Sequence, residues 1–265
     1  MKSPILVTGG TGTLGSSVVR GLRCAGQDVR VLSRSAQPAT PGIEYVTGDL
    51  SQDVGISRAL DGVGIIVNCA GSARHDREQA QSLVRAATRA GMPPHLVYVS
   101  VVGADRIPVT SFIDRAMFGY FRAKLEAERV VAESGLPWTT LRPSQFYQSL
   151  LLVARKLTRL PVLPAPTRVR FQPIDGEEVA ARLVELALGP PAGLVPEMAG
   201  PRVYTMAELL RSYLRASHRH RLILPIGAPG QAARAVRAGA NLAPKQAVGH
   251  RTWEAFLAEA LGGGG

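Results

Sequence analysis

The chain has 265 residues, of which 46% are hydrophobic and only 5% aromatic, so we expect a large, mainly aliphatic core. The net charge is +11, but the basic residues are scattered and not interleaved with aromatics, which argues against a nucleic-acid partner. No apolar run is long enough to cross a membrane, no signal peptide is evident, and two cysteines are too few for a disulfide framework or a zinc site. These features predict a cytoplasmic protein that contains no metal.

Short aliphatic runs alternate with amphipathic stretches over the first half of the chain, as in βαβ units. The nearly continuous, β-branched runs suit central strands of a parallel sheet that is covered on both faces. Predicted strands cover residues 5–7, 29–32, 43–46, 65–68, 96–99 and 138–142. Predicted helices cover residues 14–25, 53–60, 74–90, 117–134, 177–188, 206–217 and 253–261. The fold class expected is α/β, a Rossmann-like, doubly wound parallel sheet with a small C-terminal elaboration that contributes to substrate binding.

The pattern is looser in the second half of the chain. Residues 160–166, LPVLPAP, are expected to form a proline-rich loop that packs against the protein, because they are too apolar for a disordered linker. Residues 218–221, HRHR, come nearest to a basic cluster, and we interpret them as a solvated loop rather than a phosphate-binding patch. Cys24 and Cys69 are expected to be small, reduced core residues.

A glycine-rich loop, TGGTGTLG, runs from Thr8 to Gly15 between the first predicted strand and the first predicted helix. It satisfies G-x-G-x-x-G, and this spacing in this context is the fingerprint of dinucleotide binding. Glycines let backbone amides approach a pyrophosphate, and the helix N-terminus adds a partial positive charge. A glycine-rich turn without a ligand is the alternative, which the position and spacing disfavour. The loop residues expected to bind the dinucleotide are Gly9, Thr11, Gly12, Thr13, Leu14 and Gly15.

The end of the second predicted strand distinguishes NADH from NADPH. An enzyme that uses NAD usually has Asp or Glu there to bind the ribose hydroxyls. This sequence reads VLSRS and has Arg34 instead, whose guanidinium can form charge-assisted hydrogen bonds with a 2′-phosphate. An exposed arginine with no such role is the alternative. The sequence favours NADP(H).

Tyr120 and Lys124 are four residues apart on one face of a predicted helix. A nearby ammonium stabilises the phenolate, which lowers the pKa of the tyrosine from about 10 and makes it a better proton donor. Alone, the pattern Y-x-x-x-K occurs often by chance on protein surfaces. Behind a dinucleotide loop and the fifth strand of such a sheet, it predicts Tyr120 and Lys124 as catalytic residues, with Lys124 also binding the cofactor ribose.

These motifs together resemble the short-chain dehydrogenase/reductases, and specifically their atypical branch of NmrA-like, NAD(P)H-binding reductases. The resemblance extends to GDL around Asp49, NCAG around Ala70, YVS ending at Ser100, and LRP ending at Pro143. It implies that Asp49 lies by the adenine, that Ala70 and Gly71 pass along the ribose, and that Pro143 flanks the nicotinamide carboxamide. From the same motifs, Leu50 and Ser100 are included in the expected cofactor site.

One position departs from that family. Its catalytic members carry a Ser or Thr hydroxyl just beyond the fifth strand, where it helps hold the substrate carbonyl. This sequence reads SVVG there, so Ser100 comes too early and Val102 occupies the expected position. Thr110 or Ser111, from the following loop, could substitute for the missing hydroxyl.

Residues 1–265 are expected to form a single NAD(P)-binding Rossmann domain. Ligands of such sheets lie beyond the carboxyl ends of the strands, so substrate-pocket elements are expected mainly from residues 102–116, 144–171 and 189–261. Apolar side chains predict the pocket walls, and Gln145 and Gln148 could supply polar contacts. The expected wall residues are Val109, Phe112, Phe118, Phe146 and Tyr147.

The function that the sequence favours is an NADPH-dependent oxidoreductase, of ketoreductase, enone reductase or quinone reductase type, acting on an apolar, aromatic or polyketide-like carbonyl substrate. The missing hydroxyl motivates an alternative, a non-catalytic, NmrA-like redox sensor that binds NADP(H). An epimerase or dehydratase with tightly held NAD is disfavoured by Arg34 and by the missing hydroxyl. The expected partner is a small-molecule substrate, without nucleic acid or membrane, and the chain is expected to be a monomer or homodimer.

Overall fold

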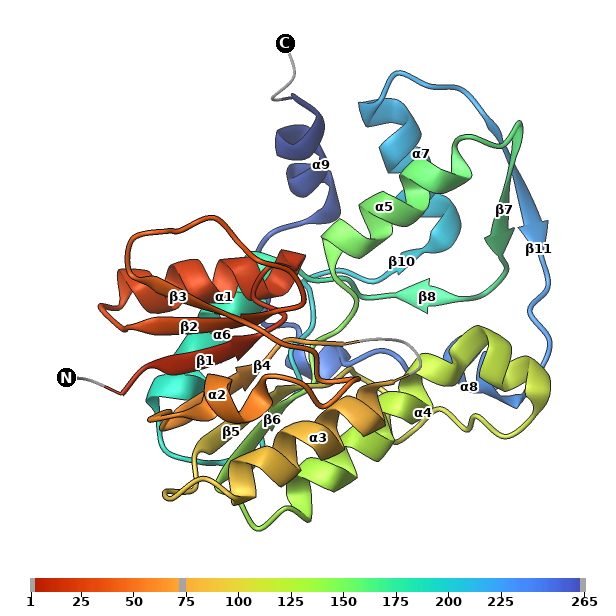
Figure 1. Cartoon of the computed structure of the whole chain (residues 1–265). Coiled ribbons are helices and arrows are strands. Elements are labelled where there is room, and N and C mark those ends of the chain that lie inside the picture. The colour runs from red at the N-terminus through yellow and green to blue at the C-terminus, as the bar shows by residue number, and fades with distance from the viewer. Residues whose placement is uncertain (1–2, 72–74, 263–265) are drawn as a thin grey trace. The chain divides into compact units, whose positions relative to one another are not determined.

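The computed structural model describes residues 3–71 and 75–262 (Figure 1). The chain forms two compact units, each built from three segments. Unit 1 comprises Met1–Ser100, Ala123–Arg142 and Glu177–Pro196, and unit 2 comprises Val101–Arg122, Pro143–Gly176 and Glu197–Gly265. Helix α4 (Phe112–Ala132) contributes residues to both units.

Unit 1 is built on a seven-stranded sheet in which every pairing is parallel. The strand order is β3-β2-β1-β4-β5-β6-β9, which confirms the predicted Rossmann-like, doubly wound sheet. Six of its strands were predicted to within a residue at either end, whereas β9 had no sequence signal. The strands are β1 (Ile5–Thr8), β2 (Val29–Ser33), β3 (Ile43–Thr47), β4 (Ile65–Asn68), β5 (His95–Val99), β6 (Trp138–Leu141) and β9 (Gly193–Leu194).

Helices cover both faces of this sheet. Figure 1 shows α1 (Thr13–Cys24) and α6 (Gly176–Leu188) on one face, and α3 (Asp76–Thr88) with the C-terminal half of α4 on the other. Helix α1 lies close to α6 at Gly21. A Cβ added there would lie only 2.9 Å from the side chain of Val184. The short helix α2 (Ile56–Leu60) packs beside α3. The predicted start of α3 at residue 74 lies outside the described residues.

The core of unit 1 explains why these segments form helices and strands. Leu6, Ile66 and Leu96, from neighbouring strands, are at most 1% exposed and pack against Leu83 of α3 and Val131 of α4 in one cluster. Burying a side chain of this size contributes about 1.5–3 kcal/mol relative to leaving it in water. The stable sheet therefore fixes where its carboxyl ends, and the loops that follow them, are placed.

Unit 2 is formed from helices and two small, two-stranded sheets. Strands β8 (Arg170–Phe171) and β10 (Tyr204–Thr205) pair antiparallel, whereas β7 (Val162–Pro166) and β11 (Leu222–Ile226) pair parallel. Its main core stacks Tyr147, Trp253 and Phe256, with ring centroids 5.3–5.7 Å apart. The helical elements are α5 (Tyr147–Leu157), α7 (Met206–Ala216), α8 (Gln231–Arg237), α9 (Trp253–Gly262) and the 3-10 turn η1 (Pro244–Gln246).

Two predictions of irregular structure in unit 2 were wrong. The expected pocket segment 144–171 contains helix α5, whose residues Tyr147, Leu150, Leu151 and Ala154 recur at helical spacing and are buried. The proline-rich segment 160–166 contains strand β7. Proline has no N–H to donate, so it is tolerated in a strand only where no neighbouring strand needs that hydrogen bond. Among the described strands, β7 pairs with β11 alone, so its other edge needs no donors.

The cysteine prediction was half right. Both thiols are free, but Cys24 is exposed at the end of α1, whereas Cys69 is partly buried after β4. Over the described ranges, no helix is long and apolar enough to span a membrane. The same residues contain no group of three or more His, Cys, Asp or Glu side chains placed to hold a metal ion.

Candidate active site

The glycine loop follows β1 and is shaped by its own backbone contacts. Gly9 has a φ of +67°, which an L side chain rarely adopts, and a Cβ there would lie 2.7 Å from the backbone nitrogen of Ala70. A Cβ on Gly15 would collide with the carbonyl oxygen of Gly9. The Gly12 N–H donates to the same oxygen at 2.9 Å. The loop therefore lies against the Ala70 segment, and both Gly9 and Gly15 are required by packing.

The N-terminus of α1 is open to a ligand. Its N-cap is Gly12, so no side chain caps the helix, and its first turn carries no acidic residue. The first amides of a helix have no partner within the helix and bear a partial positive charge. Thr11, Gly12 and Thr13 are exposed. This cradle of glycines and uncapped amides fits a dinucleotide pyrophosphate.

The residues expected around the adenosine have different environments. Arg34 is exposed just after β2, and its guanidinium has no hydrogen bond or ion pair among the described residues. The Asp49 carboxylate accepts a hydrogen bond from the Ser51 N–H at 2.7 Å, which fixes the turn after β3. Leu50 is 5% exposed and belongs to the hydrophobic core of unit 1. Leu50 therefore supports the site by packing, whereas Arg34 is available for a 2′-phosphate.

Lys124 lies at the carboxyl end of the sheet in a tight set of contacts. Its side chain is 6% exposed, and Nζ donates to the carbonyl oxygen of Val99 at 2.9 Å. Nζ also lies 3.1 Å from Oδ2 of Asp76 and 5.0 Å from the centroid of the Tyr98 ring. A Cβ on Gly71 would lie 3.4 Å from Nζ. The structure thus brings Lys124 to the end of β5 and to the loop after β4.

Asp76 is the residue that sequence reasoning missed. It begins α3, is 3% exposed and provides the counter-charge for Lys124. Its only sequence signal was an acidic residue near the start of a helix, which is common for reasons of helix polarity alone. A buried ion pair is costly to break, because the remaining partner is left as an uncompensated charge. Asp76 therefore fixes the position of Lys124.

Ser100 lies directly after β5, with its hydroxyl buried. The residue is 3% exposed, and its Oγ has no hydrogen-bond partner among the described residues. A buried hydroxyl without a partner is uncommon, since burying it costs free energy. This orphaned oxygen at the carboxyl edge of the sheet fits a group supplied by a ligand.

The residues expected to complete the catalytic set lie in unit 2. Tyr120 is 38% exposed on α4 and meets Phe121 edge-on, with ring centroids 5.9 Å apart. The carbonyl of Pro143 accepts a hydrogen bond from the Val102 N–H at 2.9 Å. Val102 itself is fully buried with Ala199 and Ala243. Position 102 is therefore a core position in unit 2.

The hydroxyls of Thr110 and Ser111 are already engaged. Ser111 Oγ donates to the Asp114 carboxylate at 2.8 Å, and Thr110 Oγ1 lies 3.5 Å from the same oxygen. Asp114 also accepts from the Ala232 N–H at 3.1 Å, which ties α8 to the start of α4. These contacts make Thr110 and Ser111 part of a structural network around Asp114.

The expected pocket walls are mostly packed within unit 2. Val109 is 8% exposed in a cluster against which Phe118 packs, whereas Phe112 is 79% exposed. Tyr147 is fully buried and donates to the carbonyl of Arg251 at 2.6 Å. The two predicted polar residues, Gln145 and Gln148, each have a buried Oε1 without a hydrogen-bond partner in the described structure.

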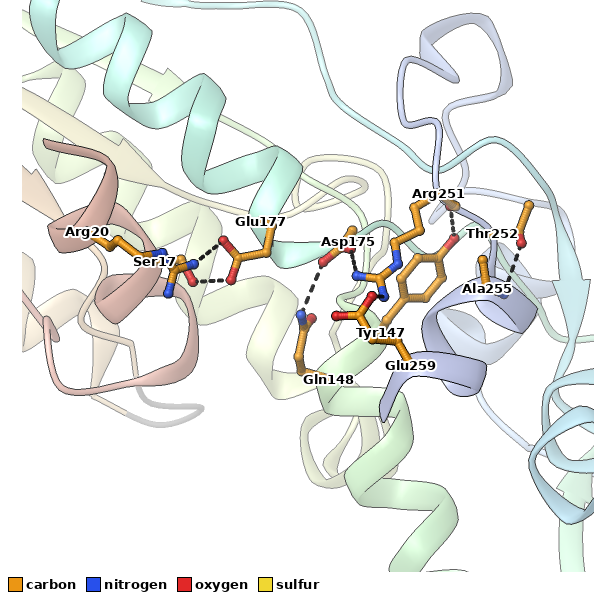
Figure 2. Close-up of polar contacts among 10 residues, drawn as sticks. All are labelled: Ser17, Arg20, Tyr147, Gln148, Asp175, Glu177, Arg251, Thr252, Ala255 and Glu259. Atoms are coloured by element: carbon orange, nitrogen blue, oxygen red, sulfur yellow. Dashed lines mark hydrogen bonds and ion pairs between the residues drawn. The ribbon is translucent and has the colours of Figure 1, made fainter. Parts of the chain in front are cut away.

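Figure 2 shows two polar networks, one in each unit, that the sequence did not predict. In unit 1, Glu177 of α6 accepts from Ser17 at 2.7 Å and pairs with Arg20, so it holds α6 to the helix that begins at the glycine loop. In unit 2, the buried Asp175 accepts from Gln148 at 3.2 Å and from Arg251 at 2.7 Å. Both networks stabilise elements rather than presenting a reactive group.

Cys69 is not a nucleophile in this site. Burial raises the pKa of its thiol to about 12, in spite of the opposing charge of Lys124. The thiolate, not the thiol, is the reactive form, so this cysteine is inert near neutral pH. Among the described groups of this site, the ammonium of Lys124 and the hydroxyl of Ser100 are the side-chain groups placed to contact a ligand.

Comparison with known proteins identifies the family. Residues 9–188, more than half of the chain, match the family described as NAD(P)H-binding. The chain belongs to the NAD(P)H-binding family. Its match to this family and the parallel sheet confirm the resemblance to the NmrA-like, atypical short-chain dehydrogenase/reductases.

Several known proteins are similar to this chain over most of their length. The chain is 30% identical over 213 residues to (4-alkanoyl-5-oxo-2,5-dihydrofuran-3-yl)methyl phosphate reductase of Streptomyces griseus, covering 77% of this chain and 70% of that protein. It is 29% identical over 222 residues to NAD(P)H azoreductase of Xenophilus azovorans, covering 81% and 74%. Among solved structures, the NADPH complex of quinone oxidoreductase QOR2 from Escherichia coli superposes with a TM-score of 0.78 at 19% identity, covering 97% of this chain and 99% of that one. At that identity, the superposition shows the shared fold.

Proposed function

We propose that this protein is an NADPH-dependent oxidoreductase that reduces an apolar carbonyl or quinone. The observation that carries the proposal is the position of Lys124, fixed by Asp76 and Val99 at the same edge of the sheet as the uncapped glycine loop. Family membership supports a nicotinamide cofactor, and the related proteins named as reductases support the reaction class. The apolar character of the substrate rests on the composition of the segments 102–116 and 144–171.

The preference for NADPH over NADH rests on Arg34. It is exposed, it has no partner among the described residues, and it follows β2, where the family binds the adenosine ribose. No carboxylate stands at the end of β2 to favour an unphosphorylated ribose. A guanidinium in this position supports recognition of a 2′-phosphate.

In the proposed mechanism, bound NADPH supplies a hydride to the substrate. The amides at the start of α1 would bind the pyrophosphate, and Lys124 would donate a hydrogen bond to the ribose. Ser100 Oγ would bind a polar atom of the cofactor or substrate. Tyr120 would give its phenolic proton to the substrate oxygen, and an ammonium near it would favour the phenolate that remains.

A second candidate function is an NADP(H)-binding redox sensor without turnover. The specific observation that favours it is that none of the positions considered for the missing hydroxyl beyond β5 offers a free hydroxyl group. Val102 is in the core, and Thr110 and Ser111 are bound to Asp114, so these positions offer no free hydroxyl to a substrate carbonyl. A sensor would bind the oxidised and reduced cofactors with different affinities and pass the difference to a partner.

Cofactor consumption distinguishes the two functions. The wild-type protein is mixed with NADPH and a panel of quinones, enones, ketones and azo compounds, and absorbance at the reduced nicotinamide band is followed. The reductase proposal expects turnover on at least one class, with kcat reduced about 100-fold or more in Tyr120→Phe and NADPH affinity unchanged. Arg129→Ala, an exposed position in the last turn of the same helix, is the control. Full activity in Tyr120→Phe would remove the proton-donor role, and no turnover on any class, with NADPH bound, would favour the sensor.

A further inference from the structure

Unit 2 contains a large groove to which the proposed mechanism assigns no residue. Its volume is about 1590 Å³, and all of its lining residues belong to unit 2. They come from the turn before β7, from α7 and from the segment that leads into β11. Pockets for small molecules have volumes of about 300–1,000 Å³. A groove of this size suits an extended chain.

The groove has a strong positive charge. Six arginines line it, all of them exposed, against two glutamates. Five of them lie within residues 202–221, and folding brings Arg159 to the same groove. The arginines are Arg159, Arg202, Arg211, Arg215, Arg219 and Arg221.

The two glutamates do not neutralise this charge. Glu254 accepts hydrogen bonds from the hydroxyls of Tyr204 at 2.8 Å and Ser212 at 3.3 Å. Glu208 completes the capping box of α7, where its Oε2 accepts from the Thr205 N–H at 2.7 Å. Within the described ranges, none of the six arginines forms an ion pair with a carboxylate. Arg202 lies over the Tyr204 ring, Arg215 donates to the Ser212 hydroxyl at 3.4 Å, and Arg221 donates to the carbonyl of His220 at 2.8 Å. Each guanidinium has five donors, so further donors remain for carboxylates of a partner.

Strand β11 adds a free backbone edge beside these arginines. In the described part of the chain it pairs with β7 on one side and with no strand on the other, and Figure 1 shows the two as a narrow ribbon. Thr167 N–H donates to the carbonyl of Ile226 at 2.9 Å, so alternate backbone groups of β11 face β7 and those of Ile223 face away. Leu222 and Leu224 are 67% and 51% exposed. Pro225, the next outward-facing residue, offers only its carbonyl, so the part of this edge that can accept an added strand centres on Ile223.

We propose that this groove binds an extended, acidic segment of a partner protein, which adds to the free edge of β11. Its carboxylates would pair with the arginines, and its aliphatic side chains would cover Leu222 and Leu224. A second copy of this chain fits poorly, because it would bring six more arginines to the same face. Single-stranded nucleic acid stacks on exposed aromatic rings. Tyr204 of the groove is 1% exposed, so its exposed rings are the imidazoles of His218 and His220, and an oligonucleotide is therefore included in the test as the competing occupant.

The test uses the full-length protein and labelled probe peptides, with fluorescence anisotropy at low salt. The first probe is a decapeptide that alternates glutamate and valine. A lysine–valine peptide controls for charge, and a glutamate–valine peptide with alternate backbone nitrogens methylated controls for strand addition. Saturable binding is expected for the first probe alone, and it should weaken as salt is added.

Variants locate the site. Charge reversal of two exposed residues of α7, Arg211→Glu with Arg215→Glu, should weaken binding of the first probe by about tenfold or more. The matched control, Arg234→Glu on α8, reverses an exposed arginine of unit 2 outside the groove and should change it by less than about twofold. NADPH binding and the thermal transition of each variant report whether it is folded.

Four outcomes would overturn the proposal. They are no binding of the first probe, equal binding of the methylated peptide, equal losses in the α7 and α8 variants, and tighter binding of a decathymidylate oligonucleotide or of phosphatidylglycerol vesicles than of the first probe. The comparison of the three peptides uses only the wild-type protein, so it decides the question even if the α7 variant fails to fold. The reductase activity can fail its own test without affecting this one, because none of the residues assigned to cofactor binding or proton transfer lines the groove.

Discussion

At the scale of single residues, the buried pair of Lys124 and Asp76 has the largest consequences. The two side chains are 6% and 1% exposed, so neither charge is well solvated. Lys124 also donates to the Val99 carbonyl, which satisfies part of its hydrogen-bonding capacity. Because desolvation of both ions offsets much of their attraction, the pair adds little net stability, but removal of one partner is expensive.

We therefore expect Asp76→Asn to lower the free energy of unfolding by about 3 kcal/mol, since it leaves the ammonium of Lys124 buried without a counter-charge. Urea denaturation measures this. The control is Asp53→Asn, which breaks the exposed pair of Asp53 and Arg85 and should cost less than about 1 kcal/mol. The double variant Asp76→Asn with Lys124→Met should recover part of the loss. Equal effects of the two Asp→Asn variants would mean that the Lys124 charge is solvated.

The second prediction at this scale concerns Arg34. Arg34→Ala should weaken NADPH binding by about tenfold to a hundredfold, which corresponds to losing charge-assisted hydrogen bonds to one phosphate, and should leave NADH binding nearly unchanged. Calorimetric titration with both dinucleotides measures the difference. Arg89→Ala, an exposed position at the end of α3, is the matched control. Equal losses for NADH and NADPH would contradict recognition of the 2′-phosphate.

At the scale of elements, the glycine loop that leads into α1 has the least room for side chains. Its glycines are held between the backbone of the loop and the Ala70 segment, and its N-terminus has no side-chain cap. Helix α4 begins in the opposite way, because its first turn is held by the carboxylate of Asp114 through Ser111 and the amide of Ala232. One helix start is open to a ligand, and the other is closed by the protein.

We expect Gly15→Ala to lower unfolding stability by about 1–3 kcal/mol, because the new methyl group collides with the backbone of Gly9. It should also abolish detectable NADPH binding, since the loop must open to relieve the collision. Gly91→Ala is the control, as a Cβ there meets nothing within 4 Å. Chemical denaturation and dinucleotide titration give the two readouts. Unchanged NADPH affinity in Gly15→Ala would separate the loop from the binding site.

The cap of α4 predicts a dependence on pH. The hydrogen bond from the Ser111 hydroxyl holds the pKa of Asp114 below its ordinary value. A carboxylate with a lowered pKa stabilises the fold above the pKa of the unfolded chain, about 3.9, and this contribution is lost as pH falls through the folded value. Thermal unfolding of the wild type between pH 7 and pH 3 should therefore lose more stability than that of Asp114→Asn. Parallel losses in the two proteins would exclude this contribution.

The elements also show what could be predicted from the sequence and why. The strands of the parallel sheet have continuous β-branched runs, and six were located to within a residue. Helix α5 was missed although Tyr147, Leu150 and Leu151 carry the helical pattern, because neighbouring prolines and glutamines favoured an irregular pocket segment. Strand β7 was missed because two of its five residues are proline, a pattern compatible with a strand only where one edge is unpaired.

The site was predicted in part, for a related reason. Motifs mark residues whose backbone must adopt a special shape, such as Gly9, and residues with fixed spacing, such as Tyr120 and Lys124. Asp76 could not be found in this way, since its role depends on packing between α3 and α4 and leaves no local pattern. The environments of Val102, Thr110 and Ser111 depend on tertiary contacts as well.

At the scale of the whole molecule, charge is the property that folding changes most. The sequence carries a net charge of +11 with no obvious cluster, which argued against an anionic macromolecular partner. Yet arginines from residues 159 to 221 line one groove of unit 2. Sequence separation hides such a surface, because it is assembled from a turn, a helix and a strand end. The segment 218–221 is an exposed loop, as predicted, and it also contributes to this lining.

This net charge should make stability depend on salt. Self-repulsion destabilises the folded chain at low ionic strength, where charges interact over about 30 Å, and it is screened at 0.15 M, where the range is about 8 Å. The exposed ion pairs that salt weakens contribute less than about 1 kcal/mol each. Raising potassium chloride from about 0.01 M to about 0.15 M should therefore raise the melting temperature by about 2–4 °C, as measured by calorimetry. A fall in the melting temperature would show that ion pairs dominate instead.

The packing of the glycine loop limits what its sequence motif indicates about the function of a related protein. Gly9 and Gly15 are needed because a side chain at either position would collide with the protein's own backbone, whether or not a dinucleotide is bound. A descendant that had lost its chemistry would still fold only if it kept these glycines. We therefore expect this glycine motif to indicate a shared fold rather than a shared reaction. It should be found also in related proteins that have lost their catalytic residues.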